Sequence, residues 1–326
     1  MHPEFPPVSF LAALSLLLPL PSHWRAQNVA TLSIIAWLFI LNVVYGVDAI
    51  IWSDNVNIVI PVWCDITSKI IIGSTFALPA TCLCICIHLE HVASVNRRKT
   101  LLSDKRIRQL FELFMCFGLP MVSMGLHCIV QGHRFDIIEG YGCRPTTYVS
   151  IPAIFLIWVP PLTLSAIALG FACASFVQFA RRRSTFARYL DTSRNGLTIF
   201  RYFRLMLLAV VEMIWNIMVT SYTLWFSAMD IRPWTNWADV HWNFSRIDLY
   251  PTAFMPKIVI THYYLAWWIV PASTFIFVAF FAFGKDAVNE YTACIMWIRR
   301  NVLKQTIGQT APGSVPLARY VMCSQH

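Results

Sequence analysis

Two groups of residues in this sequence have side chains that could hold a metal ion. His88 and His91 lie one helical turn apart, but no third ligand of the same kind follows them. Cys82, Cys84 and Cys86 are spaced by two, so a helix directs the middle thiol away from the other two. Zinc is held by three or four converging protein ligands. We therefore predict no metal site and interpret the histidine pair as a solvated helix end.

Catalytic motifs are absent as well. The sequence contains neither the Gly-x-Ser-x-Gly turn of serine hydrolases nor the His-Glu-x-x-His helix of zinc peptidases. Residues 258–283 hold no lysine, which excludes a retinal Schiff base in that segment. Arginines do not recur at every third position, as they would in a voltage sensor. We predict that the chain is not an enzyme and needs no cofactor.

A cysteine pair could form a disulfide. Cys64 precedes an uncharged run of 18 residues, 70–87, and Cys143 lies in a loop that the topology below places at the same end of the protein. That end is expected to face the outside, where disulfides form, and no other cysteine is expected there. We predict a bridge between Cys64 and Cys143 that pins the loop over a helix end. Two free thiols are the alternative.

The composition indicates which elements carry these residues. Of the 326 residues, 57% are hydrophobic and only 13% are charged, whereas soluble domains carry about 25% charged residues. We therefore predict an all-α membrane protein, a bundle of seven transmembrane helices. Because no basic residue precedes the first apolar segment, we interpret it as a span and not as a cleaved signal. The predicted spans are residues 5–21, 29–52, 66–88, 110–130, 146–180, 205–229 and 258–283.

The lysines and arginines predict the orientation. Nineteen of the 25 fall in one set of loops and in the tail, and six fall in the other set. Cytosolic loops are the richer in basic residues, so we expect the N-terminus outside and the C-terminus in the cytosol. This topology, with attraction to the anionic lipid bilayer, explains the net charge of +9 without nucleic-acid binding. Asn243-Phe-Ser245 is a glycosylation sequon in an outside loop and predicts a glycan on Asn243.

Three regions are expected along the chain. Residues 1–283 form the transmembrane domain. In residues 284–304, apolar side chains recur every three or four positions beside basic ones, which predicts an amphipathic helix on the inner membrane surface. Cys294 in that helix could be acylated or unmodified. Residues 305–326 are predicted to be a short, flexible cytosolic tail.

Polar residues within the predicted spans are candidates for a switch. Glu212 and Asn216 lie one turn apart on the sixth span, and Asn42 on the second could join them. Such groups face the bundle interior because contact with lipid is costly. They could hold and release the inner half of the sixth helix, or they could form static interhelical hydrogen bonds of about 0.6–2 kcal/mol each. Both interpretations remain open.

Several short motifs carry a family resemblance. The stretches 19–28, 42–52 and 63–66 resemble fungal class D G-protein-coupled receptors for lipidated mating pheromones, the a-factor receptor type of basidiomycetes. Gln131-Gly-His-Arg-Phe-Asp136, Gly142-Cys-Arg-Pro145 and Tyr202-Phe-Arg-Leu-Met206 are similar to the same family. The resemblance implies a prenylated peptide pheromone as ligand, a heterotrimeric G protein as partner and a role in mating. It also implies a path for lipid between the fifth, sixth and seventh spans.

Within this interpretation we expect two contact surfaces. Ligand contacts are expected near the outer rim, at Asp65, Lys69, Glu139, Arg144, Trp234, Trp237, His262 and Tyr263. The aromatic residues among them could equally anchor the protein at the membrane interface, and Lys69 could instead extend its ammonium to that interface. G-protein contacts are expected at the inner face, at Arg97, Arg98, Arg181, Arg182, Arg201 and Arg204.

Two alternative functions stand beside the receptor interpretation. One is a receptor-like paralogue without a mating role. The other is a small multi-span transporter, which would have a midplane substrate site and often internal repeats. The sequence offers only Glu212 and two asparagines at that depth, and its halves do not mirror each other.

Overall fold

The computed structural model describes residues 2–93, 105–181 and 199–281. Arg97, Arg98 and Arg182 lie outside the described residues. So do the amphipathic helix and the tail that the sequence predicts after residue 283.

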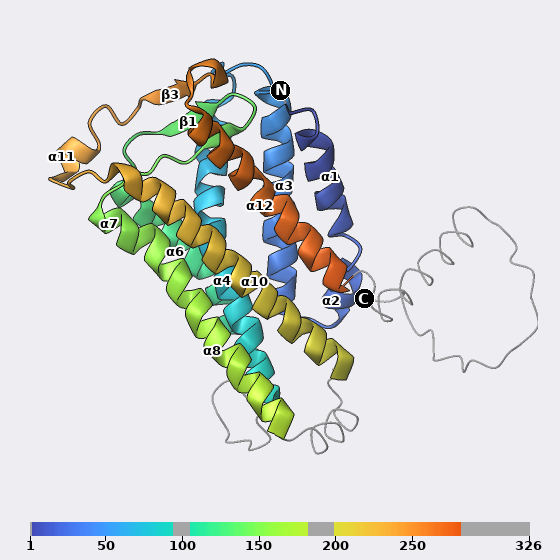
Figure 1. Ribbon diagram of the computed structural model, residues 1–326. Coiled ribbons are helices and arrows are strands. Elements are labelled where there is room, and N and C mark those ends of the chain that lie inside the picture. The colour runs from blue at the N-terminus through green and yellow to red at the C-terminus, as the bar shows by residue number, and fades with distance from the viewer. Residues whose placement is uncertain (1, 94–104, 182–198, 282–326) are drawn as a thin grey trace, which may run out of the picture.

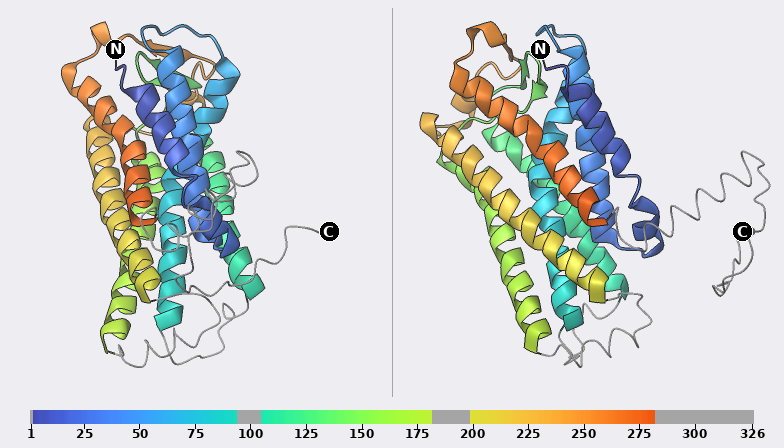
Figure 2. Two further views of the ribbon diagram at one scale, coloured as in Figure 1. Left: turned by 90° about the vertical axis from the view of Figure 1, so that its right-hand side faces the viewer. Right: turned by 45° about the vertical axis from the view of Figure 1, so that its right-hand side comes forward.

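Seven helical segments in the described part of the chain are long and apolar enough to cross a membrane, which confirms the predicted number. They run side by side as one bundle (Figures 1 and 2). The third segment is the most enclosed, because 72% of its most apolar stretch of 18 residues is buried, and it forms the centre of the bundle. The segments are Phe5–Arg25, Val29–Ile51, Pro61–His91, Arg106–Val130, Ile151–Arg181, Tyr202–Asp230 and Lys257–Phe281.

The first three spans consist of four helices. The first span is interrupted between Ser15 and Leu20, and its second helical piece begins directly after Pro19. The Asn28 side chain caps the following helix by accepting a hydrogen bond from the amide of Thr31 at 3.2 Å. These helices are α1 (Phe5–Ser15), α2 (Leu20–Arg25), α3 (Val29–Ile51) and α4 (Pro61–Ala93).

The fourth and fifth spans each contain a π-helical turn just before a proline. Pro120 has no N–H to donate to the carbonyl of Cys116, and the indole N–H of Trp37 donates to that oxygen instead, at 3.0 Å. The sequence predicts kinks at Pro152, Pro160 and Pro161, and a π turn lies between the first of these prolines and the other two. The elements are α5 (Lys105–Leu113), η2 (Phe114–Gly118), α6 (Leu119–His127), η3 (Cys128–Val130), α7 (Ile151–Ala153), η4 (Ile154–Trp158) and α8 (Val159–Arg181).

A long connection joins the sixth span to the seventh. It carries one short helix, one strand and two 3₁₀ turns, and its helix lies to the side of the bundle in Figure 1. The elements are α10 (Ile199–Ser227), η5 (Ala228–Asp230), α11 (Trp237–Val240), β3 (Ile247–Tyr250), η6 (Thr252–Phe254) and α12 (Lys257–Phe281).

A three-stranded sheet covers one end of the bundle, beside the N-terminus (Figure 1). Strand β1 (Phe135–Ile138) lies in the middle, antiparallel to β2 (Gly142–Arg144) and parallel to β3. The sheet therefore joins the connection between spans four and five to the connection between spans six and seven. We call this end of the bundle the sheet end. No pattern in the sequence predicts a strand here.

Several span boundaries differ from prediction, among them that of the fourth span, which begins at Arg106 and not at residue 110. The third span begins at Pro61 and not at residue 66, so Cys64 and Asp65 lie in the first turn of α4 and not in the loop before it. The first span extends to Arg25, and the fifth begins at Ile151 after an extended stretch. Helix ends follow capping and tertiary contacts more closely than they follow hydropathy.

Candidate functional site

A disulfide fixes the sheet to the central helix. Cys64 in the first turn of α4 is bonded to Cys143 in β2, with their Cα atoms 5.2 Å apart. Both cysteines are buried, and they pack with Trp52, Phe135 and Ile137 in one apolar cluster. The sequence predicts this pair, and the structure contains it. The hairpin of β1 and β2 is thereby held over the sheet end of α4.

Asp65 and Lys69, both expected to contact a ligand, hold the segment that enters β1. Arg134 donates to both carboxylate oxygens of Asp65, from Nε at 2.8 Å and from Nη2 at 2.5 Å. These hydrogen bonds raise the pKa of the Arg134 guanidinium above its ordinary value. The ammonium of Lys69 donates to Gln131 Oε1 at 2.6 Å and to Nδ1 of His127 at 3.1 Å. In this structure both α4 side chains are therefore engaged with the protein itself.

Glu139 connects the two loops that form the sheet. Its Oε2 atom accepts hydrogen bonds from the amide of Thr252 at 2.7 Å and from the hydroxyl of the same residue at 2.8 Å. Thr252 follows β3 and opens η6, so the carboxylate satisfies an amide at the start of that turn. This expected ligand contact also has a partner within the protein.

Arg144 is the last residue of β2, and its side chain lies beneath the sheet, with only 9% of the residue's surface exposed. Its guanidinium carbon is 4.4 Å from the centroid of the Tyr45 ring, close enough for a cation–π interaction. Asp48 lies nearby on α3, fully buried, and accepts a hydrogen bond from the indole of Trp63 at 2.8 Å. The side chain of Asp48 also lies against Gly142 of β2, where any side chain would overlap it. A layer of buried polar groups thus supports the hairpin.

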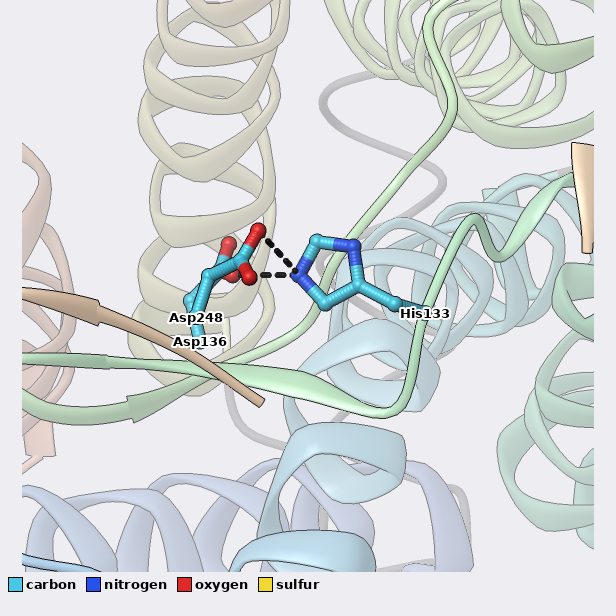
Figure 3. Close-up of side chains that lie close together, drawn as sticks. All are labelled: His133, Asp136 and Asp248. Carbon is cyan, nitrogen blue, oxygen red and sulfur yellow. Dashed lines mark hydrogen bonds and ion pairs between the residues drawn. The ribbon is translucent and has the colours of Figure 1, made fainter. Parts of the chain in front are cut away.

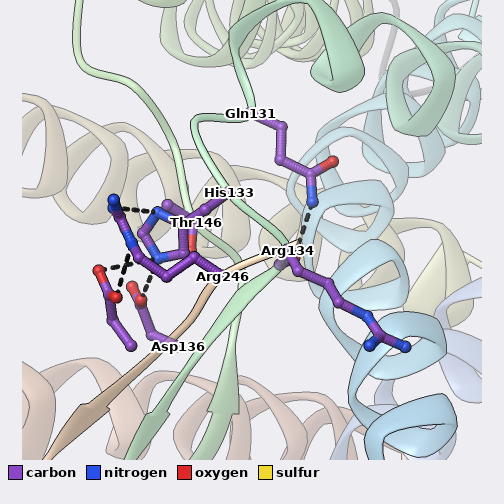
Figure 4. A network of polar contacts seen from close by, with 7 residues as sticks. Gln131, His133, Arg134, Asp136, Thr146 and Arg246 are labelled. Carbon is purple, nitrogen blue, oxygen red and sulfur yellow. Dashed lines mark hydrogen bonds and ion pairs between the residues drawn. The ribbon is translucent and has the colours of Figure 1, made fainter. Parts of the chain in front are cut away.

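A second polar cluster joins β3 to β1, and no motif in the sequence predicts it. The imidazole of His133 lies 2.6 Å from Asp136 Oδ1 and 3.3 Å from Asp248 Oδ2, both measured from Nε2 (Figure 3). Arg246 reaches Nδ1 of the same ring at 3.1 Å and Asp248 Oδ1 at 2.8 Å (Figure 4). The hydroxyl of Thr146 lies 3.2 Å from Nε2. We call His133, Asp136, Arg246 and Asp248 the clasp.

The clasp residues include three possible metal ligands, whose atoms lie within 4.8 Å of one another. The position of Arg246 disfavours a metal there. A guanidinium can only donate, so Nδ1 of His133 must accept, and the ring proton then sits on Nε2. Nε2 is the ring nitrogen that faces the two carboxylates, and it could bind a metal only without that proton. Arg246 also offsets the charge of the carboxylates, so we interpret the clasp as a structural ion-pair network.

The aromatic residues expected to contact a ligand fall into two places. His262 on α12 stacks on Phe226 of α10 with the ring centroids 3.7 Å apart, and Tyr263 lies beside Tyr141 at 6.0 Å. Burial raises the pKa of Tyr141 to about 12, so this phenol is neutral at physiological pH. Trp234 and Trp237 lie farther out, on the connection that carries α11.

Trp237 is 56% exposed and stacks on His241, with the ring centroids 3.9 Å apart. The Trp234 indole donates to the carbonyl of Ile129, at 3.5 Å. The eight expected ligand residues therefore do not converge on one point. Six of them lie on or beneath the sheet and at the neighbouring end of α12, and the two tryptophans lie to one side.

The expected G-protein residues that the structure describes lie at the end opposite the sheet. Arg181 is exposed at the end of α8. Arg204, near the start of α10, lines an apolar groove of about 550 Å³ between α8, α10 and α12. Arg201 is on the same helix, and its side chain lies outside the described residues. The groove is where the family resemblance implies a lipid path, between spans five, six and seven, but it lies in the half away from the sheet.

The three polar residues proposed as a switch do not form one group in this structure. The Asn42 amide donates to Thr274 Oγ1 and to the Leu38 carbonyl, each at 2.7 Å, and so links α3 to α12. The Asn216 amide donates to Ser165 Oγ at 2.6 Å and links α10 to α8. Glu212 is buried on α10. The amide hydrogen bonds of Asn42 and Asn216 thus go to different helices, and neither goes to Glu212.

Comparison with known proteins places these features in a family. The model of the family described as pheromone A receptor matches residues 4–300. The pheromone B beta 1 receptor of Schizophyllum commune is 58% identical over 293 residues, which cover 89% of this chain and 54% of that protein. The pheromone B alpha 3 receptor of S. commune strain H4-8 is 30% identical, over 92% of this chain and 48% of that protein.

Pheromone receptor 2 of Mycosarcoma maydis is 29% identical, over 83% of this chain and 79% of that protein. The chain spans about half the length of the Schizophyllum relatives that it matches. No solved structure matches it.

Proposed function

Because this chain belongs to the pheromone A receptor family, we propose that it is a plasma-membrane receptor that binds a peptide pheromone outside the cell and activates a heterotrimeric G protein inside. The observation that carries the proposal is the 58% identity to a named pheromone receptor across 89% of the chain. The seven-span bundle with one end capped by a disulfide-bonded sheet is consistent with it. On this proposal the protein acts by binding and not by catalysis.

The orientation is part of the proposal. We place the sheet end outside and the groove end in the cytosol. The uneven distribution of lysines and arginines supports this assignment. The Cys64–Cys143 disulfide supports it as well, since disulfides persist outside the cell and are reduced in the cytosol.

Glycosylation at Asn243 tests this orientation. Asn243 is exposed in the connection that carries α11 and β3, so an outside location should let it receive an N-glycan. We expect an endoglycosidase-sensitive mobility shift on gels, lost in Asn243→Gln and in Ser245→Ala. An epitope tag inserted in the same connection should bind antibody on intact cells. Binding only after permeabilisation would reverse the proposed orientation.

We place the ligand at the sheet end, as a prenylated peptide. The expected contacts Lys69, Glu139 and Arg144 lie there with charged or polar groups, and Tyr263 and His262 supply aromatic surface beside them. Because Lys69 and Glu139 already have partners, a ligand would have to exchange its own groups for these contacts. If the exchange is possible in only one of two receptor states, the ligand binds that state more tightly and shifts the equilibrium toward it.

The helix links within the bundle suggest which elements respond. Asn42–Thr274 joins α3 to α12, and Asn216–Ser165 joins α10 to α8. Both α10 and α12 are attached to the connection that carries β3, so a ligand on the sheet acts directly on their outer ends. We propose that activation shifts these links and opens the cytosolic face, with Glu212 on α10 taking part.

The experiment that tests the function is nucleotide exchange on a co-expressed fungal G protein. Membranes holding the chain receive a panel of synthetic pheromone peptides, each with and without the prenyl group. We expect one compatible peptide to stimulate exchange, and only in its prenylated form. Silence across the whole panel, with folded protein at the surface, would favour a receptor-like paralogue. Substrate uptake instead of exchange would favour a transporter.

Charge reversal at the groove end tests the G-protein surface. Arg201→Glu with Arg204→Glu should abolish the stimulated exchange, because the two positions lie at the proposed cytosolic start of α10. The matched control is Arg232→Glu at the sheet end, whose side chain is 59% exposed and pairs with its neighbour Asp230. Surface amount should equal that of the parent protein in both variants. Normal exchange by the double variant would remove this surface from the proposal.

A further inference from the structure

The sheet has a free edge. Its strand order is β2-β1-β3, so β3 pairs with β1 on one side, and no strand among the described residues lies beyond it (Figure 1). The carbonyls of Arg246 and Tyr250 accept hydrogen bonds from the amides of Arg134 and Glu139, each at 3.2 Å. Successive residues of a strand direct their backbone N–H and C=O groups to opposite sides. The amides of residues 247 and 249 are therefore directed to the free edge.

The free edge is accessible and flanked by apolar side chains. Leu249 is 43% exposed and Tyr250 38%, and Phe254 in the following turn is 86% exposed. An exposed strand edge offers a row of unpaired donors and acceptors to another chain. Apolar neighbours supply side-chain contacts for whatever pairs there.

The strand is held in position before anything binds to it. Arg246 and Asp248 join the clasp, which secures the start of β3 to β1. Glu139 binds both the amide and the hydroxyl of Thr252, which secures the end. A template fixed at both ends loses little conformational freedom on binding, and such preorganisation favours affinity.

We propose that an extended segment of the peptide ligand pairs with the free edge of β3 as a fourth strand. The inference rests on the proposed function, which supplies the peptide, and it assigns where and how its backbone is recognised. Main-chain pairing of this kind gives affinity without demanding a particular sequence. Specificity would then come from the side chains around the edge, with Leu249 and Phe254 among them.

The test on the ligand side is a scan of backbone N-methylation. The probe is the prenylated synthetic peptide that stimulates exchange in the panel above, N-methylated at one amide at a time. Because only alternate amides of a paired strand face the template, we expect binding to weaken about three- to tenfold at every second position of one short segment. The positions between them should change binding less than about twofold.

The matched test on the receptor side uses Leu249. Leu249→Pro removes an outward amide, and proline is tolerated on an edge strand where its missing N–H faces solvent. We expect the probe to bind about three- to tenfold more weakly, with the surface amount unchanged. Leu249→Ala retains the amide and should bind more tightly than the proline variant. Tyr250→Pro removes an amide that faces β1 and should reduce the amount of folded protein instead.

The outcomes separate this inference from the proposed function. A flat methylation scan with a peptide that still binds and stimulates exchange would overturn the edge pairing and leave the receptor function in place. Should Leu249→Pro fail to fold, the scan on the peptide still decides. Cross-linking of two copies through Leu249→Cys, undisturbed by the peptide, would assign the edge to a dimer and overturn the inference. If no peptide of the panel binds, both proposals fail together.

Discussion

Replacing either Cys64 or Cys143 by serine should destabilise the protein by about 4 kcal/mol. The bridge closes a loop between residues 79 apart in the sequence, and cross-linking a loop of that size restricts the unfolded chain enough to account for this amount. Both sulfurs lie in a buried apolar cluster with Trp52 and Phe135, so a hydroxyl would also replace an apolar contact. The hairpin of β1 and β2 would lose its covalent attachment to α4.

The measurement is thermal unfolding of protein reconstituted in lipid nanodiscs, with surface display in cells beside it. Cys64→Ser, Cys143→Ser and the double variant should lose nearly equal amounts, because each removes the same bond. Cys173→Ser, an exposed free cysteine at the groove, is the matched control and should unfold like the parent. Reducing agent should lower the melting temperature of the parent but not of the double variant. A single variant that melts like the parent would show that the bridge adds no stability.

The seven spans could be predicted because a bilayer admits few solutions. Each backbone polar group in lipid must be satisfied within its own helix, so a crossing segment has to be long, apolar and continuous. Two clear examples are residues 29–52 and 258–283. The structure places helices there at Val29–Ile51 and Lys257–Phe281. The boundary at Pro61 was not predictable in the same way, since polar residues such as Asp65 occupy the first turns of α4 for tertiary reasons.

The sheet could not be predicted because its strands are too short to show a period. β2 has three residues and β1 and β3 have four each, and the pairing of β1 with β3 joins segments that lie far apart in the sequence. Hydropathy alternation needs a longer run to be recognised. The cysteine pair was the exception, because compartment and topology alone restricted which thiols could meet.

The sequence indicated which residues lie at the candidate site, but not the hydrogen-bond partners of their side chains. Lys69 and Glu139 were expected to contact a ligand because charged groups stand at the mouth of the bundle. The structure shows them bonded to Gln131 and Thr252, which no sequence spacing indicates. The clasp was missed for the same reason, because Asp248 joins it only through the parallel pairing of β3.

Gly142→Ala should be the most damaging single change in the hairpin after loss of the disulfide. Gly142 has a φ of +74°, which costs a residue with a Cβ roughly 1–2 kcal/mol. An added Cβ would also overlap the Cβ of Asp48, a buried residue on α3. Overlap with a packed side chain costs roughly 1–3 kcal/mol more. We expect a markedly lower melting temperature in nanodiscs and, on the proposed function, weaker pheromone-stimulated exchange.

Gly140→Ala is the control that separates the two causes. Gly140 has a φ of +80°, but an added Cβ there would find its nearest neighbour, His2, only at 3.9 Å. The Gly140→Ala variant should therefore be destabilised by backbone strain alone and should unfold at a higher temperature than Gly142→Ala. Adding Asp48→Gly to Gly142→Ala tests the overlap directly, because it removes the overlapping Cβ. The addition should cost less in the Gly142→Ala background than in the parent, and equal costs would mean that backbone strain at residue 142 is the whole effect.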